Sequence, residues 1–221
     1  DTLTGIFSAG EEPTGEKDPY ALRRAALGVI RILIEKKLPL DLVRLVDLSI
    51  LTYEESNHDI DQNTRARVLQ FIFDRYQGYF GIKGFTKDEI NAVLEVGTVP
   101  PFDFYRRLQA VSRFRRHKSA QSLSEANKRV RNILRKASQD IPFEIDSALF
   151  EFAAEEILAA SLVEVSATLT PLIERGDYTQ ALNQLSLLHE PVDRFFTDVM
   201  VLTENMTLRT NRLAMLNQLS Q

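Results

Sequence analysis

Residues 121–138 read QSLSEANKRVRNILRKAS, and this stretch decides both the fold class and the first hypothesis about function. On a helical wheel of about 100° per residue its apolar and basic side chains separate onto opposite sides. The apolar side holds Leu123, Ala126, Val130, Ile133, Leu134 and Ala137, and the polar side holds Lys128, Arg131, Asn132, Arg135 and Lys136. The pattern predicts an amphipathic helix whose outer face is basic.

The preceding segment, residues 102–117, shows the same separation. Its apolar side holds Phe104, Leu108, Val111 and Phe114, and its outer side holds Arg106, Gln109, Arg113 and Arg116. Only a short link, residues 117–120, joins the two segments, so the helices are predicted to be antiparallel neighbours. Their basic faces would then merge into one surface.

Positive charge is concentrated here in a chain that is acidic as a whole. Residues 101–138 carry eleven Lys and Arg against Asp103 and Glu125, whereas the 221-residue chain has a net charge of −4. Such concentration is typical of a protein that binds a polyanion. The alternative is a solvated helix face, paired with the acidic C-terminal third. The scarcity of acids between 104 and 138 counts against pairing within these helices.

The rest of the chain is also helical in its patterning. Periodicity and capping signals predict helices over residues 20–37, 41–55, 61–80, 86–95, 147–175, 178–188, 191–204 and 207–219. Residues 1–18 are predicted to be a loop, with Asp18 as the N-cap and Pro19 as the first residue of the next helix. Thr86 and Glu89 have the spacing of a capping box. No stretch alternates with period two, so we expect an all-α helical bundle.

Several classes of protein are excluded or disfavoured. The absence of cysteine excludes disulfides, thiolate metal sites and cysteine nucleophiles. There is no uninterrupted apolar run of about 18 residues and no basic-then-apolar leader, so we expect a cytoplasmic chain that does not span a membrane. The start at Asp1, without Met, suggests a fragment of a longer protein.

Catalytic and metal chemistry has little support. His58-Asp59 is similar to the metal-binding pair of His-Asp phosphohydrolases, but only His117 and His189 remain as further histidines. A working phosphohydrolase fragment is therefore the weakest hypothesis, and no metal site is expected. Glu155 and Glu156 are adjacent and are predicted to lie on a solvated face. No catalytic site is evident.

Six short segments, taken in order along the chain, carry a family resemblance. They are DTLTGIF (1–7), PTG (13–15), KDPYALRRAALG (17–28), ANKRVRNIL (126–134), FFTDVMV (195–201) and LRTNRLAML (208–216). Together they resemble the C-terminal region of the bacterial glycyl-tRNA synthetase β subunit.

The resemblance implies an architecture and a set of partners. Residues 1–61 would be the end of a degenerate HD-like helical domain, and residues 62–221 a helical anticodon-binding domain similar to that of arginyl-tRNA synthetases. A polar turn near residues 56–62 independently suggests the same boundary. The family enzyme joins glycine to its tRNA with ATP at an active site on the α subunit. The implied partners are glycine tRNA, the α subunit and the rest of the β subunit, and no cofactor is expected in this fragment.

Candidate tRNA-binding residues follow from both arguments. One family-like segment contains Asn127, Lys128, Arg129 and Asn132, and the same basic face includes Arg131 and Arg135. Phosphates of the RNA would be held by Arg106, Arg113 and Arg116. Phe104, Tyr105 or Phe114 would either stack on a splayed base or belong to the core. The competing hypothesis is a docking module that contacts other parts of the synthetase and reads little RNA.

Overall fold

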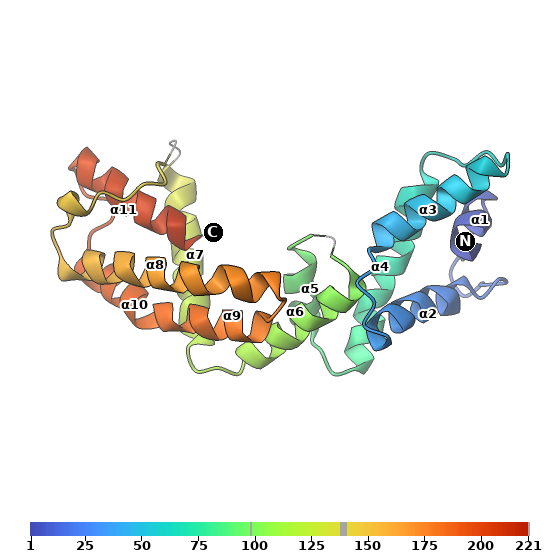
Figure 1. Cartoon of the computed structure of the whole chain (residues 1–221), viewed down its shortest axis with the longest axis horizontal. Helices are drawn as coiled ribbons and strands as arrows, with labels where there is room; N and C mark the ends of the chain where they lie inside the picture. The colour runs from blue at the N-terminus through green and yellow to red at the C-terminus, as the bar shows by residue number, and fades with distance from the viewer. Residues whose placement is uncertain (98, 138–140, 221) are drawn as a thin grey trace. The chain divides into compact units, whose positions relative to one another are not determined.

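The protein is all-α, as predicted. The computed structural model describes residues 1–97, 99–137 and 141–220, and within these ranges the only extended pairing is an isolated bridge between Thr14 and Lys17. The chain divides into two compact units, Asp1–Ser112 and Arg113–Gln221. Figure 1 shows the helices of each unit.

The first unit is organised around one long helix. Its helices are α1 (Thr2–Ser8), α2 (Leu22–Glu35), α3 (Leu42–Glu55), α4 (Thr64–Ile82), α5 (Lys87–Leu94) and most of α6 (Pro101–Phe114), which continues into the second unit. Helix α4 contacts α1, α2, α3 and α5 (Figure 1). The core is rich in aromatic side chains, of which Phe7, Tyr76, Phe80 and Phe104 are at most 1% exposed. Burying such rings contributes much of the hydrophobic stabilisation of a small unit.

Helix α1 corrects one expectation, because residues 1–18 were predicted to be a loop. Leu3, Thr4 and Phe7 are buried on one side of this short helix. The Phe7 ring lies edge-on to Phe71 of α4, with 5.1 Å between the ring centroids. The glycine and acidic residues around α1 are typical of loops, and tertiary burial of an apolar side outweighs that tendency.

The start of α2 also differs from the prediction. The helix begins at Leu22 rather than Pro19, and its N-cap is Ala21, whose φ is 55°. The Asp18 carboxylate nevertheless accepts hydrogen bonds from the backbone N–H groups of Leu22 and Arg23, at 2.7 and 3.0 Å. Asp18 therefore caps the free backbone N–H groups of the first turn, although it lies three residues before the N-cap residue Ala21.

The capping box of α5 is confirmed. The Thr86 hydroxyl accepts from the backbone of Glu89, and the Glu89 carboxylate accepts from the backbone of Thr86. Such local signals need no knowledge of the rest of the fold, because donor and acceptor are three residues apart.

The compact units divide at a different place from the predicted domains. The predicted boundary between residues 61 and 62 falls between α3 and α4, which pack against each other inside the first unit. The polar turn at this place marks the end of α3 only. The apolar faces on either side of the turn share one core, which includes Val46 and Val68.

The second unit is a separate bundle. It contains α7 (Ala120–Ala137), α8 (Ala153–Glu174), α9 (Tyr178–Leu185), α10 (His189–Asp198) and α11 (Met206–Leu219), with 3-10 turns at Ser147–Leu149 and Ser186–Leu188. Helix α8 contacts α9, α10 and α11, and α7 contacts α10 and α11. The core is mainly aliphatic, and Leu158, Phe195 and Leu216 are fully buried in it.

A buried ion pair lies within this bundle and corrects the expectation that Glu155 faces solvent. Its carboxylate is 0% exposed and accepts a 2.8 Å hydrogen bond from Arg212, whose side chain is only 3% exposed. Arg212 also donates to Glu151, at 2.8 Å, and to the carbonyl of Met200, at 3.1 Å. Burial alone would raise the pKa of Glu155. The hydrogen bonds from Arg212 and from the backbone of Glu151 and Phe152 outweigh burial, so the pKa lies below its usual value.

Helix α8 also has an outward apolar side. By length and composition alone it passes as a helix that could cross a membrane, which for a single helix is weak evidence. Its inner side, with Ala154, Leu158 and Leu162, is buried in the second core. Its outer side carries Val163, which is 71% exposed. The bundle therefore explains only part of the hydrophobicity of α8.

Candidate nucleic-acid interface

Helix α7 is amphipathic, as its sequence predicts. Val130 is fully buried in the second core, and Ile133 and Leu134 pack against the same core. All the cationic and amide residues proposed on this helix are exposed, namely Asn127, Lys128, Arg129, Arg131, Asn132 and Arg135. Burial of one face thus fixes the direction in which the basic face points.

The basic face of α7, defined here as Lys128, Arg131, Asn132, Arg135 and Lys136, is not neutralised by carboxylates. Among the described residues, no acid lies within ion-pair distance of the cations of this face. Arg135 instead donates to the side-chain oxygen of Asn132 at 3.1 Å. A solvated face paired with the acidic third of the chain would show such pairs. The observed arrangement favours the binding of an external anion.

Arg129 differs from the basic face in its surroundings. Its guanidinium lies over the Phe196 ring of α10, 4.1 Å from the ring centroid. This cation–π contact restricts the side chain. Arg129 nevertheless remains exposed.

The proposed phosphate-binding residues around α6 fall in different units. Arg106 belongs to the first unit, where its guanidinium lies 5.8 Å from the centroid of the Phe102 ring. Arg113 and Arg116 belong to the second unit and are exposed. Because α6 lies mostly in the first unit and α7 in the second, a common basic surface of the two helices stays a prediction.

The aromatic candidates for base stacking do not form a group. Phe104 is 1% exposed and packs on Tyr76 of α4, with 4.7 Å between the centroids, so it is a core residue. Tyr105 is half-buried and stacks on Phe80 at 6.1 Å. Phe114 is half-buried and lies parallel to the His117 ring at 6.0 Å. For Phe104 the core interpretation is confirmed.

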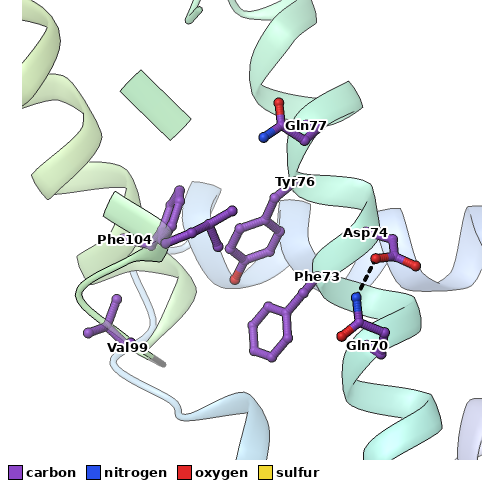
Figure 2. Close-up of a pocket in the computed structure, with 9 residues that line it drawn as sticks. Gln70, Phe73, Asp74, Tyr76, Gln77, Val99 and Phe104 are labelled. Carbon is purple, nitrogen blue, oxygen red and sulfur yellow. Dashed lines mark hydrogen bonds between the residues drawn. The ribbon is translucent and has the colours of Figure 1, made fainter. Parts of the chain in front are cut away.

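A pocket of about 630 Å³ lies beside this aromatic cluster in the first unit. Figure 2 shows Phe73, Tyr76 and Phe104 at its wall, with Gln70 donating to Asp74 at 2.6 Å. Burial raises the pKa of Tyr76 far above its usual value, so the phenol stays neutral. No cationic residue is among the described residues that line this pocket, so it does not resemble a phosphate-binding site.

A second pocket, of about 550 Å³, lies along the polar side of α7. Its lining is Glu125, Lys128, Arg129, Asn132, Ile133, Lys136 and Leu202. Three of the predicted site residues are therefore together at one hollow. Glu125, Lys136 and Leu202 were not among the predicted site residues. Glu125 could have been found from the sequence, because it lies three and four residues before Lys128 and Arg129 and so shares their side of the helix. Nothing in the sequence places Leu202 at this pocket.

The described residues contain no group of three or more histidines and acids that could hold a metal ion. The ring of His58 stacks on Tyr53, with 6.0 Å between the centroids. His58 and Asp59 thus follow the end of α3 without the further ligands that His-Asp chemistry needs.

Comparisons with known proteins agree with the two units. The family described as "Glycyl-tRNA synthetase beta subunit" matches residues 1–95, and the family described as "DALR anticodon binding domain" matches residues 123–221. The first match lies inside the first unit and the second inside the second unit. The basic face of α7 falls in the DALR match.

Curated relatives match the whole chain. The glycine–tRNA ligase β subunit of Pasteurella multocida is 46% identical over 219 residues, and that of Shewanella amazonensis is 46% identical over 220 residues. Each alignment covers 99% of this chain and 32% of the relative, so the chain spans about a third of the length of these proteins. The chain belongs to the glycyl-tRNA synthetase β-subunit family, and it corresponds to the C-terminal part of that subunit.

Proposed function

We propose that this chain is the tRNA-binding end of a glycine–tRNA ligase β subunit and that its second unit binds the anticodon arm of glycine tRNA. The observation that carries the proposal is the basic face of α7, which is exposed, has no carboxylate partner among the described residues and lies within the match to an anticodon-binding domain. Phosphates and unpaired bases supply the anions and the hydrogen-bonding edges that such a face lacks.

The side chains divide by the contacts they suit. Arg131 and Arg135 present forked guanidinium groups, which bind phosphates in a bidentate manner. Asn127 and Asn132 carry amides that both donate and accept, so they suit base edges. Arg106, Arg113 and Arg116 would add phosphate contacts further along the anticodon arm.

The wider activity belongs to the whole enzyme. The complete ligase would attach glycine to its tRNA with ATP at the α subunit, and this chain would bring the tRNA to it. Its partners would be glycine tRNA, the α subunit and the remainder of the β subunit, in the cytoplasm. The chain itself would need no cofactor and perform no chemical step.

The test is binding of this chain to a glycine tRNA transcript across a series of salt concentrations. Arg131→Ala and Arg135→Ala should each weaken binding roughly tenfold, as expected for the loss of a charged hydrogen bond. Each should also lower the slope of log affinity against log salt by about 1. Arg31→Ala is the matched control, because it removes an exposed helical arginine from the first unit. Unchanged affinity in both α7 variants, with helical circular dichroism intact, would overturn the site assignment.

A docking role is the second candidate, and the outward side of α8 favours it. Val163 is 71% exposed there, and Ile157 and Ile173 of the same helix, on either side of its buried face, are 37% and 48% exposed. Exposed aliphatic side chains along one helix are typical of a protein contact. Stable complex formation with the α subunit or the upstream β segments, together with indifference to tRNA at low salt, would support this role over RNA binding.

A further inference from the structure

The pocket on α7 has the composition of a site for a planar, polar ligand. Its charged rim comes from a stripe of α7 residues, Glu125, Lys128, Arg129, Asn132 and Lys136. Ile133 and Leu202 add apolar surface to it, and Leu202 is 45% exposed. Apolar surface inside a ring of hydrogen-bonding groups suits a nucleobase, whose faces are apolar and whose edges are polar.

Glu125 is the distinctive member of this pocket. It is the single acid within α7, and it lies among three cations of the lining. Lys128 and Arg129 follow at the spacings where helical ion pairs form, yet no such pair is present among the described residues. Gln121 instead donates to Oε1 of Glu125 at 3.1 Å. The carboxylate is thus oriented by a neutral neighbour and keeps its capacity to accept further hydrogen bonds.

A carboxylate at this place is unfavourable for phosphate binding alone, because it repels the RNA backbone. Its presence is explained if the ligand brings a donor group to it. An exocyclic amine of a base is such a donor, and Glu side chains accept from the N4 amine of cytosine. The Watson–Crick edge of cytosine presents one donor, N4, beside two acceptors, N3 and O2. One carboxylate beside a cluster of lysine, arginine and asparagine donors matches that order.

We propose that the α7 pocket binds one unpaired cytosine of the tRNA, with Glu125 accepting from its N4 amine and neighbouring donors, chiefly Lys128 and Asn132, serving N3 and O2. The inference rests on the proposed tRNA-binding function and adds the base that is read. Glycine codons begin with two guanines, so glycine anticodons contain two cytosines. The pocket reads one of them.

Arg129 supplies a surface on which the base stacks. Its guanidinium lies over the Phe196 ring, 4.1 Å from the ring centroid, and the residue remains exposed at the edge of the pocket. Guanidinium planes stack on unpaired bases in RNA-binding proteins. A base in the pocket would thus extend a stack that Phe196 and Arg129 already form.

The experiment compares binding of glycine tRNA transcripts in which each anticodon cytosine is replaced in turn by uracil. Uracil has a carbonyl at position 4 in place of the amine, so it repels the carboxylate. The wild-type chain should bind the unmodified transcript about tenfold more tightly than one of the two substituted transcripts. Glu125→Ala should clearly lower that ratio, and any remainder comes from the donors that face N3, which accepts in cytosine and donates in uracil. The variant should do so without weakening binding of the uracil transcript, because a negative charge near the RNA has been removed.

Two further variants make the result specific. Glu125→Gln should also lower the preference, since the amide can turn to accept from cytosine or donate to uracil. Glu164→Gln removes an exposed acid from α8 in the same unit and should leave the preference unchanged.

Each outcome has a distinct meaning. A preference in Glu125→Ala as large as that of wild type would overturn the cytosine site while leaving tRNA binding intact. Equal wild-type binding of all three transcripts would do the same. If the wild-type chain binds none of them even at low salt, the proposed function itself fails, and the cytosine site fails with it.

Discussion

Helix α4 of the first unit and helix α7 of the second use arginine in opposite ways. In the first unit, Arg67 of α4 donates to Glu12, Asp61 and the carbonyl of Phe7, and so ties the N-terminal segment to the central helix. Arg65 binds Asp47 of α3 in the same manner. On α7 of the second unit, the exposed cations have no carboxylate partner among the described residues. The number of basic residues that the fold leaves unpaired is therefore a better indicator of an anion-binding surface than the total number of basic residues in a segment.

The cores differ as well. The first unit packs aromatic rings edge to face around Tyr76, which contacts Phe73, Phe80 and Phe104. The second unit is aliphatic and contains the buried pair of Arg212 and Glu155. A buried ion pair contributes little net stability when complete, and breaking it is costly because one charge is left buried alone.

The largest expected effect is therefore on the second unit. Arg212→Ala should lower the free energy of unfolding of that unit by about 3–5 kcal/mol, because Glu155 loses its charged partner in the core. Amide hydrogen exchange resolved by peptide should show faster exchange in α8 and α11, with α2 and α4 unchanged. Arg194→Ala is the control, since Arg194 forms an exposed pair with Asp198 at 3.4 Å and should cost less than about 1 kcal/mol. Equal losses in both variants would mean that burial of the pair has no energetic consequence.

A smaller effect should follow from pH. The pKa of Glu155 is lower in the folded chain than the usual value of 4.5, so the folded state holds this proton less tightly than the unfolded state. The resulting stabilisation is full above pH 4.5 and is lost as the pH falls through the lowered folded-state pKa. Urea unfolding of wild type from neutral pH down to about pH 3 should show this loss. Glu155→Gln should be less stable at neutral pH and flatter in acid, whereas a curve parallel to wild type would assign the acid sensitivity to other carboxyl groups.

The features that the sequence predicted are those encoded locally. The amphipathic pattern of α7 and the Thr86–Glu89 capping box each depend on residues within a few turns of one another, and both are present. The burial of Glu155 could not be predicted in this way, because its partner Arg212 lies 57 residues further along the chain. Helix α1 was missed for the same reason, since the side chain that covers Phe7 belongs to α4.

The candidate site shows the same limit. Its predicted members Lys128, Arg129 and Asn132 were found because charge and helical periodicity identify an exposed face. The hollow beside them is not a property of that face alone, because Leu202 follows α10 and Phe196 lies on it. Sequence patterning therefore located the helix, and only the packing of α10 against it located the pocket.

The smallest expected effect tests the comparison between the units most directly. Arg31→Ala removes an exposed arginine paired with Glu35 at 2.8 Å, and it should cost about 0.3–0.5 kcal/mol of stability while leaving tRNA affinity unchanged. Arg131→Ala should leave stability unchanged and weaken tRNA binding, because Arg131 pairs with no carboxylate among the described residues and the proposed function gives it an RNA phosphate as its partner. Urea unfolding and tRNA titration of the same two proteins measure both quantities. If Arg31→Ala weakened tRNA binding as much as Arg131→Ala, total charge rather than the unpaired face of α7 would govern binding. Such a result would mean that the electrostatic potential of the whole chain, rather than the unpaired arginines of α7, attracts the tRNA. The paired and unpaired arginines of the two units would then not differ in function.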